Sequence, residues 1–192
     1  MVPLNVPNVL TVVRILLVPV LVVALLAKTT GGDVLAAIVF AVASLTDALD
    51  GKLARSRNSV TTFGKLMDPL ADKLLIIAAL VALVSRGRLA AWVAMVIIAR
   101  EFAVTVLRVA AGTQQGVVIS ASALGKLKTA AQVAMVMVLI AIDDRPWWIY
   151  LIIYATVAIT VLSGADYFFG FRRLVRSRGG ASRGAGTPRP EG

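Results

Sequence analysis

Six stretches of this 192-residue chain are apolar over roughly the length that a helix needs to cross a lipid bilayer. Such a helix takes about 20 predominantly apolar residues. Hydrophobic residues make up 59% of the chain, and the abundance of Ala and Val is typical of tightly packed membrane helices. The pattern predicts an all-α, polytopic membrane protein with six transmembrane helices.

The predicted spans run roughly over 9–27, 34–54, 66–84, 89–111, 121–142 and 147–171. The fifth is the least distinct, because its clearly apolar part, 130–142, is short. Residues 1–173 are therefore predicted to form one membrane domain. Residues 174–192 are rich in Gly, Arg, Ser and Pro, which predicts a basic, disordered tail. The first residues lack a basic region, so no cleavable signal peptide is expected.

The distribution of positive charge predicts that both termini face the cytoplasm. Thirteen Lys and Arg residues fall in segments that would then lie inside, and four fall outside: Lys28, Arg86, Arg88 and Arg145. The net charge of +10 follows mainly from this bias, and it also favours anionic lipids and phosphorylated substrates. Nucleic acid is not expected as a partner, because the cations lie in short loops and one tail.

Four of the ten acidic residues form a regular row: Asp47, Asp50, Asp68 and Asp72. The first two are three residues apart and the last two four apart, so each pair shares a face of its predicted helix. Carboxylates are costly near lipid, and gathering four of them demands a cation. The chain has neither Cys nor His, so the ion must be hard and bound by oxygen. We expect Mg²⁺ or Mn²⁺, with two ions acting on a diphosphate.

Simpler roles remain open for single members of the row. Asp68 precedes Pro69 and could cap a helix, because proline is favoured in a first helical turn. Asp47 and Asp50 could pair with neighbouring cations such as Arg55 in a structural network. The spaced set as a whole is more specific than any of its parts.

The full string is Asp47-x-x-Asp50-Gly51-x-x-Ala54-Arg55, eight residues, Gly64, three residues, Asp68, three residues and Asp72. It resembles the signature of the CDP-alcohol phosphatidyltransferase family. The resemblance implies a six-span homodimer that transfers a phosphatidyl group from a CDP-linked lipid to an alcohol and releases CMP. It also implies that Asp47, Asp50 and Asp68 bind metal, and that Asp72 is both near the metal and the catalytic base. The CDP-diacylglycerol site would comprise Asp47, Asp50, Gly51, Ala54, Arg55 and Gly64.

Short strings elsewhere resemble the branch of the family whose acceptor is glycerol 3-phosphate. They are Asn5-x-Pro7-Asn8-x-x-Thr11-x-x-Arg14, Arg100-Glu101 with Arg108, Gly125-Lys126-x-Lys128-Thr129-x-x-Gln132 and Ser163-Gly164-x-Asp166-Tyr167. A phosphorylated acceptor needs cationic donors near the metal site. The candidates are Arg100, Arg108, Lys126 and Lys128, with Arg14 as a further possibility.

Other interpretations of these cations stay open. Arg100 could pair structurally with Glu101, and the remaining three could be cations that extend to the cytoplasmic membrane surface. The acceptor could also be phosphatidylglycerol, as in cardiolipin synthesis, or inositol phosphate. A different class, a divalent-cation transporter, also places carboxylates within a membrane. Because the acids gather at one membrane end, we instead expect an enzyme of the cell membrane with its active site near the cytoplasmic face.

Overall fold

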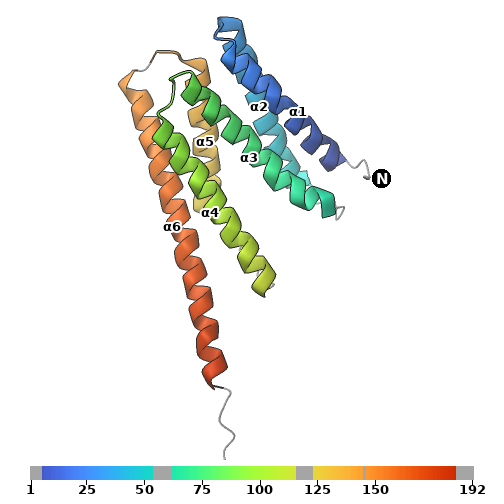
Figure 1. Ribbon diagram of the computed structural model, residues 1–192, viewed down its shortest axis with the longest axis vertical. Helices are drawn as coiled ribbons and strands as arrows, with labels where there is room; N and C mark the ends of the chain where they lie inside the picture. Colours follow the sequence, from blue (N-terminus) through green and yellow to red (C-terminus); the bar gives the residue numbers. More distant parts are fainter. Residues whose placement is uncertain (1–5, 54–61, 116–122, 145, 185–192) are drawn as a thin grey trace, which may run out of the picture.

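The computed structural model describes residues 6–53, 62–115, 123–144 and 146–184, and it describes side chains over 11–46, 73–107, 124–144 and 146–170. The described backbone is all-helical, as the sequence predicts (Figure 1). Its six helices are α1 (Val6–Leu26), α2 (Thr30–Leu53), α3 (Thr62–Ser85), α4 (Ala91–Gln115), α5 (Ala123–Ala141) and α6 (Trp147–Gly184).

The start of α3 differs from the sequence-based prediction. The helix begins at Thr62, whereas a loop was expected up to Gly64. Gly64 therefore lies in the first turn, and Asp68 and Pro69 lie more than one turn inside the helix. The interpretation of Asp68 as a helix cap is consequently wrong. The polar composition of this segment predicted a loop up to Gly64, but helical hydrogen bonding extends back to Thr62.

The end of α6 also differs from the prediction. We expected the sixth span to end near Phe171 and a disordered tail to begin at 174, but the helix continues to Gly184. Leu174 and Val175 are followed by arginines, which are good helix formers, so the segment can propagate an existing helix. Residues 185–192 lie outside the described part of the chain.

Two of the helices are long and apolar enough, over their described residues, to cross a membrane: Leu124–Ala141 in α5 and Trp147–Gly170 in α6. Shorter apolar helical stretches cover Thr11–Leu26, Thr30–Thr46 and Lys73–Ser85. Every helix also exposes large apolar side chains, among them Leu16, Ile38, Val81, Met95, Leu127 and Leu162. An outward surface of this kind fits lipid contact.

The helices pack as two groups of three. Helix α1 lies against α2 and α3, and α6 lies against α4 and α5, while α2, α3, α4 and α5 make the contacts between the groups. The connections between α1 and α2, α3 and α4, and α5 and α6 all lie at one end, at the top of Figure 1. We call this the connection end. The end of α2 and the start of α3 therefore lie toward the opposite end.

The buried interior changes character between these two ends. Toward the connection end it is apolar, with fully buried side chains such as Leu21, Phe40, Leu83, Ile97 and Leu139. Farther from that end, most of the buried residues are polar: Thr11, Arg14, Glu101, Lys128, Gln132, Thr156, Thr160 and Ser163. Buried polar groups require partners, so this tier is a specific hydrogen-bonded structure on the aspartate side of the bundle.

Candidate active site

The helical backbone supports the predicted pairing of the four aspartates. Asp47 and Asp50 lie one turn apart near the end of α2, and Asp68 and Asp72 lie one turn apart in α3. These two helices contact each other. Gly51 lies in the last turn of α2, whereas Ala54 and Arg55 fall outside the described residues. Among the side chains that the structure describes, no group of three or more acids could hold a metal ion, and those of the four aspartates are not in that set.

The polar tier next to these aspartates centres on Glu101 of α4. One carboxylate oxygen, Oε1, accepts from Nη1 of Arg100 at 3.3 Å, from Nε2 of Gln132 at 3.5 Å and from the Lys128 ammonium. Gln132 also donates to Thr160 on α6 at 3.4 Å. The side chains of Arg100, Glu101 and Lys128 are only 10%, 11% and 7% exposed. We call Arg100, Glu101, Lys128, Gln132, Thr160 and Ser163 the Glu101 cluster.

Arg100 extends across the cluster from α4 to α6. Its Nη2 donates to the Ser163 hydroxyl at 2.6 Å, while its Nε is buried and has no hydrogen-bond partner among the described residues. Its methylene chain passes over Gly164, where an added Cβ would lie 3.2 Å from Arg100 Cγ. The guanidinium is thus fixed on two sides, and its Nε is left without a hydrogen-bond partner among the described residues.

Helix α3, which carries Asp68 and Asp72, contacts α4 one turn beyond Glu101. The ammonium of Lys73, the residue after Asp72, donates to Thr105, whose hydroxyl donates in turn to the Glu101 carbonyl at 2.6 Å. Thr105 follows Glu101 by one helical turn, a rise of about 6 Å. Asp72 lies 13 residues before the end of α3 and Glu101 lies 10 residues after the start of α4, about 20 and 15 Å from the connection end, so their backbones lie about one turn apart in level.

The structure brings together two of the four cations that were predicted to bind the acceptor phosphate. Arg100 and Lys128 meet at Glu101, so the predicted structural alternative for Arg100, an ion pair with Glu101, is also present. Lys126 is exposed and lies two positions before Lys128. Arg108 lies on α4, with its side chain outside the described set. Arg14 is buried in α1 and makes polar contacts there.

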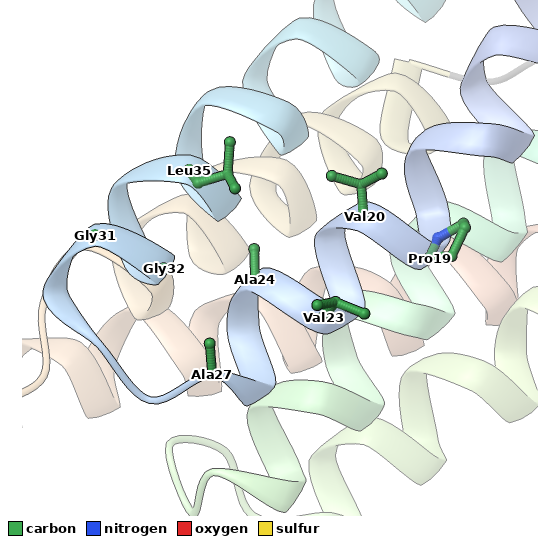
Figure 2. A pocket seen from close by; sticks show the side chains of 8 residues that line it. All are labelled: Pro19, Val20, Val23, Ala24, Ala27, Gly31, Gly32 and Leu35. Carbon is green, nitrogen blue, oxygen red and sulfur yellow. The ribbon is translucent and has the colours of Figure 1, made fainter.

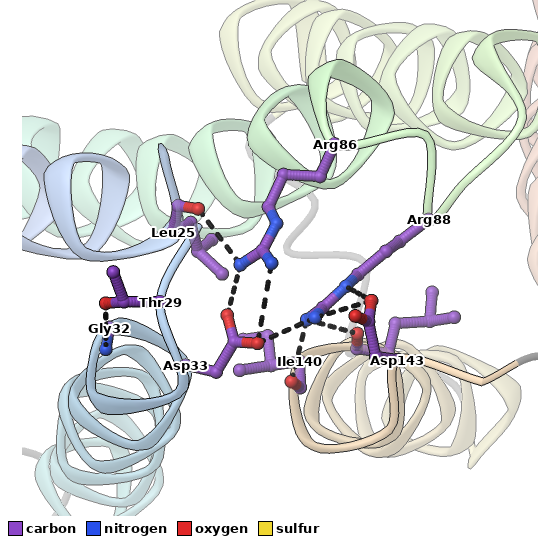
Figure 3. A network of polar contacts seen from close by, with 9 residues as sticks. Leu25, Thr29, Gly32, Asp33, Arg86, Arg88, Ile140 and Asp143 are labelled. Atoms are coloured by element: carbon purple, nitrogen blue, oxygen red, sulfur yellow. Dashed lines mark hydrogen bonds and ion pairs between the residues drawn. The ribbon is translucent and has the colours of Figure 1, made fainter. Parts of the chain in front are cut away.

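A second buried ionic network, which the sequence did not predict, lies at the connection end (Figure 3). Asp33 of α2 pairs with Arg86, and its Oδ2 lies 2.6 Å from Nη2 of Arg88. Arg88 also lies 2.7 Å from the Asp143 carboxylate and donates to the carbonyl of Ile140 at 2.9 Å. We call Asp33, Arg86, Arg88 and Asp143 the arginine clasp. It joins the ends of α3 and α5 to the start of α2.

Local backbone features place the clasp residues. Thr29 caps α2 by accepting from the Gly32 amide at 3.0 Å. A Cβ at Gly32 would lie 2.5 Å from the Ala24 carbonyl oxygen, so only glycine lets α2 approach α1 this closely. Gly87, with φ of +68°, turns the chain after α3 and directs Arg88 back into the bundle. The sequence signal that could have revealed the clasp is an acid and two arginines beside short interhelical turns.

An open pocket of about 470 Å³ lies between α1 and α2, also toward the connection end (Figure 2). Its lining includes Val20, Val23 and Leu35, and its floor is formed by small residues such as Gly31 and Gly32. None of its lining residues is charged. The pocket therefore lacks groups for phosphoryl chemistry, and the polar interior at the other end is the better candidate for the active site.

Sequence comparison decides the family. The model of the CDP-alcohol phosphatidyltransferase family matches residues 4–163, which include the whole aspartate row and the Glu101 cluster. The chain belongs to this family. It is accordingly a transferase, and the alternative of a divalent-cation transporter is set aside.

Curated relatives extend this similarity over most of the chain. A Bacillus subtilis CDP-diacylglycerol–glycerol-3-phosphate 3-phosphatidyltransferase is 43% identical over 183 residues, covering 85% of this chain and 93% of the relative. A probable phosphatidylglycerophosphate synthase of Mycobacterium tuberculosis is 39% identical, covering 92% of this chain and 84% of the relative. A Rickettsia felis enzyme with the same name as the Bacillus protein is 36% identical over 170 residues.

Proposed function

We propose that this chain is a phosphatidylglycerophosphate synthase. It transfers the phosphatidyl group of CDP-diacylglycerol to glycerol 3-phosphate and releases CMP. The observation that carries this proposal is that relatives 36–43% identical over most of the chain bear names for this reaction. The meeting of Arg100 and Lys128 near the level of Asp72 supports a phosphorylated acceptor, because such an acceptor needs paired cationic donors.

The aspartate row would hold the donor. Asp47, Asp50, Asp68 and Asp72 offer only carboxylate oxygens, which fits Mg²⁺ or Mn²⁺. When bound, two such ions would neutralise the diphosphate of CDP-diacylglycerol and favour departure of CMP. Gly51, Ala54, Arg55 and Gly64 would contact the cytidine diphosphate. The small residues among them allow the nucleotide to approach the helix backbone closely.

The acceptor would react from the Glu101 side. Arg100, Arg108, Lys126 and Lys128 would bind the phosphate of glycerol 3-phosphate, with Arg14 as a further contact. Asp72 would accept the proton of the attacking hydroxyl. The hydroxyl oxygen then forms a bond to the lipid-linked phosphorus, and the bond from that phosphorus to the CMP oxygen breaks.

This chemistry belongs to a six-span protein of the cell membrane, with both termini and the active site at the cytoplasmic face and two copies in a homodimer. Two helices are long and apolar enough to span, and all six expose apolar side chains, which supports such an arrangement. A cytoplasmic site would give direct access to soluble glycerol 3-phosphate and release CMP into the same compartment.

An acceptor panel tests the proposal. The purified protein receives CDP-diacylglycerol and Mg²⁺ or Mn²⁺ with glycerol 3-phosphate, glycerol, phosphatidylglycerol or inositol phosphate, and both CMP and the lipid product are measured. Of the four acceptors, we expect only glycerol 3-phosphate to give rapid CMP release. Preference for phosphatidylglycerol or inositol phosphate would keep the family and overturn the acceptor.

A further inference from the structure

We propose that Glu101 is a positioning residue that holds Arg100 and Lys128 as a fixed pair of cations for the acceptor phosphate. The inference rests on the proposed function and adds a role for an acid that binds neither substrate. Arg100 comes from α4 and Lys128 from α5, and Glu101 brings them to the same carboxylate oxygen.

The geometry of the shared oxygen gives the first argument. Three donors converge on Oε1 of Glu101, so the positions of the guanidinium and the ammonium are coupled through one atom. Gln132 and Ser163 fix the arrangement from the other side, through hydrogen bonds of 3.4 Å to Thr160 and 2.6 Å to Arg100. Two long, flexible cations thereby lose their freedom before any ligand arrives, which lowers the entropic cost of binding.

The charge balance gives the second argument. Two buried cations repel each other, and burying them unpaired would be costly. One carboxylate makes their proximity possible but cancels only one of the two charges. The triad of Arg100, Glu101 and Lys128 therefore keeps one net positive charge in a nearly dry interior, where attraction for a phosphate is strong.

The unused donor of Arg100 gives the third argument. A buried N–H without a partner costs free energy, and natural proteins pair nearly all such groups. Nε of Arg100 is such a group among the described residues. A guanidinium that is held by Glu101 and Ser163 but whose Nε has no partner among the described residues has capacity to bind an oxyanion.

The arginine clasp offers a matched control. Asp33 is also an acid that holds two cations, Arg86 and Arg88, but it lies at the connection end. Glu101→Gln and Asp33→Asn each remove one negative charge that is paired with two cations, and each keeps the side-chain shape; the Glu101 side chain is 11% exposed and that of Asp33 20%. A merely structural role predicts the same effect for both: lower thermal stability with unchanged substrate recognition.

The test compares the two variants in the full-length protein, using CMP release at varied glycerol 3-phosphate and varied CDP-diacylglycerol, with the melting temperature measured in parallel. We expect Glu101→Gln to raise KM for glycerol 3-phosphate by about tenfold or more, the equivalent of one charge-assisted hydrogen bond. KM for CDP-diacylglycerol should change less than twofold. Asp33→Asn should leave both KM values as in the native protein.

Glu101→Asp keeps the inference testable if Glu101→Gln does not fold. It preserves the charge but withdraws the carboxylate by one methylene, so we expect a KM for glycerol 3-phosphate above the native value. A native KM in Glu101→Asp or in Glu101→Gln would overturn the positioning role. The native protein distinguishes a failure of the proposed function from a failure of this inference. If the proposed function is wrong, the native protein releases CMP with another acceptor and not with glycerol 3-phosphate.

Discussion

At the scale of single residues, Glu101 and Asp33 show two uses of an acid that pairs with two cations in one bundle. Glu101 accepts from Arg100 and Lys128, which lie on different helices, and Asp33 accepts from Arg86 and Arg88, which share the turn after α3. Asp33 lies among interhelical turns, where its partners also bind main-chain carbonyls and so complete helix ends. Glu101 lies among side chains that face the aspartate half of the molecule. The surroundings, rather than the ion pairs themselves, separate a structural role from a functional one.

The four aspartates should separate into two kinds under substitution. Asp47→Asn, Asp50→Asn and Asp68→Asn should weaken both nucleotide binding and turnover, because each would remove a ligand of the proposed metal site. Asp72→Asn should lower turnover by about 10²–10⁴-fold, the usual contribution of a general base, with a smaller effect on nucleotide binding. CMP release and titration with a cytidine diphosphate ligand measure the two effects. Near-native turnover of Asp72→Asn would show that Asp72 is not the catalytic base.

Arg100 offers the sharpest test of the acceptor pocket. Arg100→Ala deletes one of the two cations that meet at Glu101, and we expect the glycerol 3-phosphate requirement to rise by about tenfold or more. KM for CDP-diacylglycerol should change little, because we propose that the aspartate row, and not Arg100, holds that ligand. Glycerol should be a poor acceptor for the native enzyme. Equal use of glycerol and glycerol 3-phosphate would argue against any phosphate pocket.

At the scale of helices, the apolar periodicity was sufficient to predict the order and approximate extent of all six described helices. It failed where polar segments are helical, at the start of α3 and the end of α6. The sequence likewise indicated Arg100, because it lies inside a predicted span, and Lys128, because it belongs to a short string that resembles the family branch. It could not indicate that Arg88 pairs with both Asp33 and Asp143, because these contacts depend on how three distant turns pack together.

The arginine clasp should contribute to stability in proportion to the burial of its members. Arg88 is 3% exposed, so Arg88→Met should destabilise the fold by about 3 kcal/mol, because it leaves buried acceptors without their donor. Asp143 is 79% exposed, so Asp143→Asn should cost at most about 1 kcal/mol. Thermal unfolding of the purified protein measures both. Asp144→Asn, an exposed neighbour in the same turn, is the control and should match the native protein.

At the scale of the whole molecule, the interior of the bundle differs between its two ends. The apolar tier and the arginine clasp lie toward the connection end, while the polar tier and the aspartate row lie toward the opposite end. Ion pairs occur on both sides of the predicted charge bias. Arg86 and Arg88, assigned to the outer side, are paired with acids, and so is Lys128, assigned to the inner side. The predicted asymmetry is therefore that of the charge count itself, thirteen cations against four.

The orientation in the membrane follows from that asymmetry. Positively charged loops remain in the cytoplasm, so the connection end should face outward and the aspartate end inward. The chain has no native cysteine, which allows single cysteines to report their side without background. Cysteine at Ser59, between the two aspartate pairs in sequence, should react with an impermeant reagent only after the membrane is opened. Cysteine at Asp144, an exposed position at the connection end, should react in intact cells. The reverse pattern at the two positions would place the aspartates away from cytoplasmic glycerol 3-phosphate and would contradict both the orientation and the proposed acceptor.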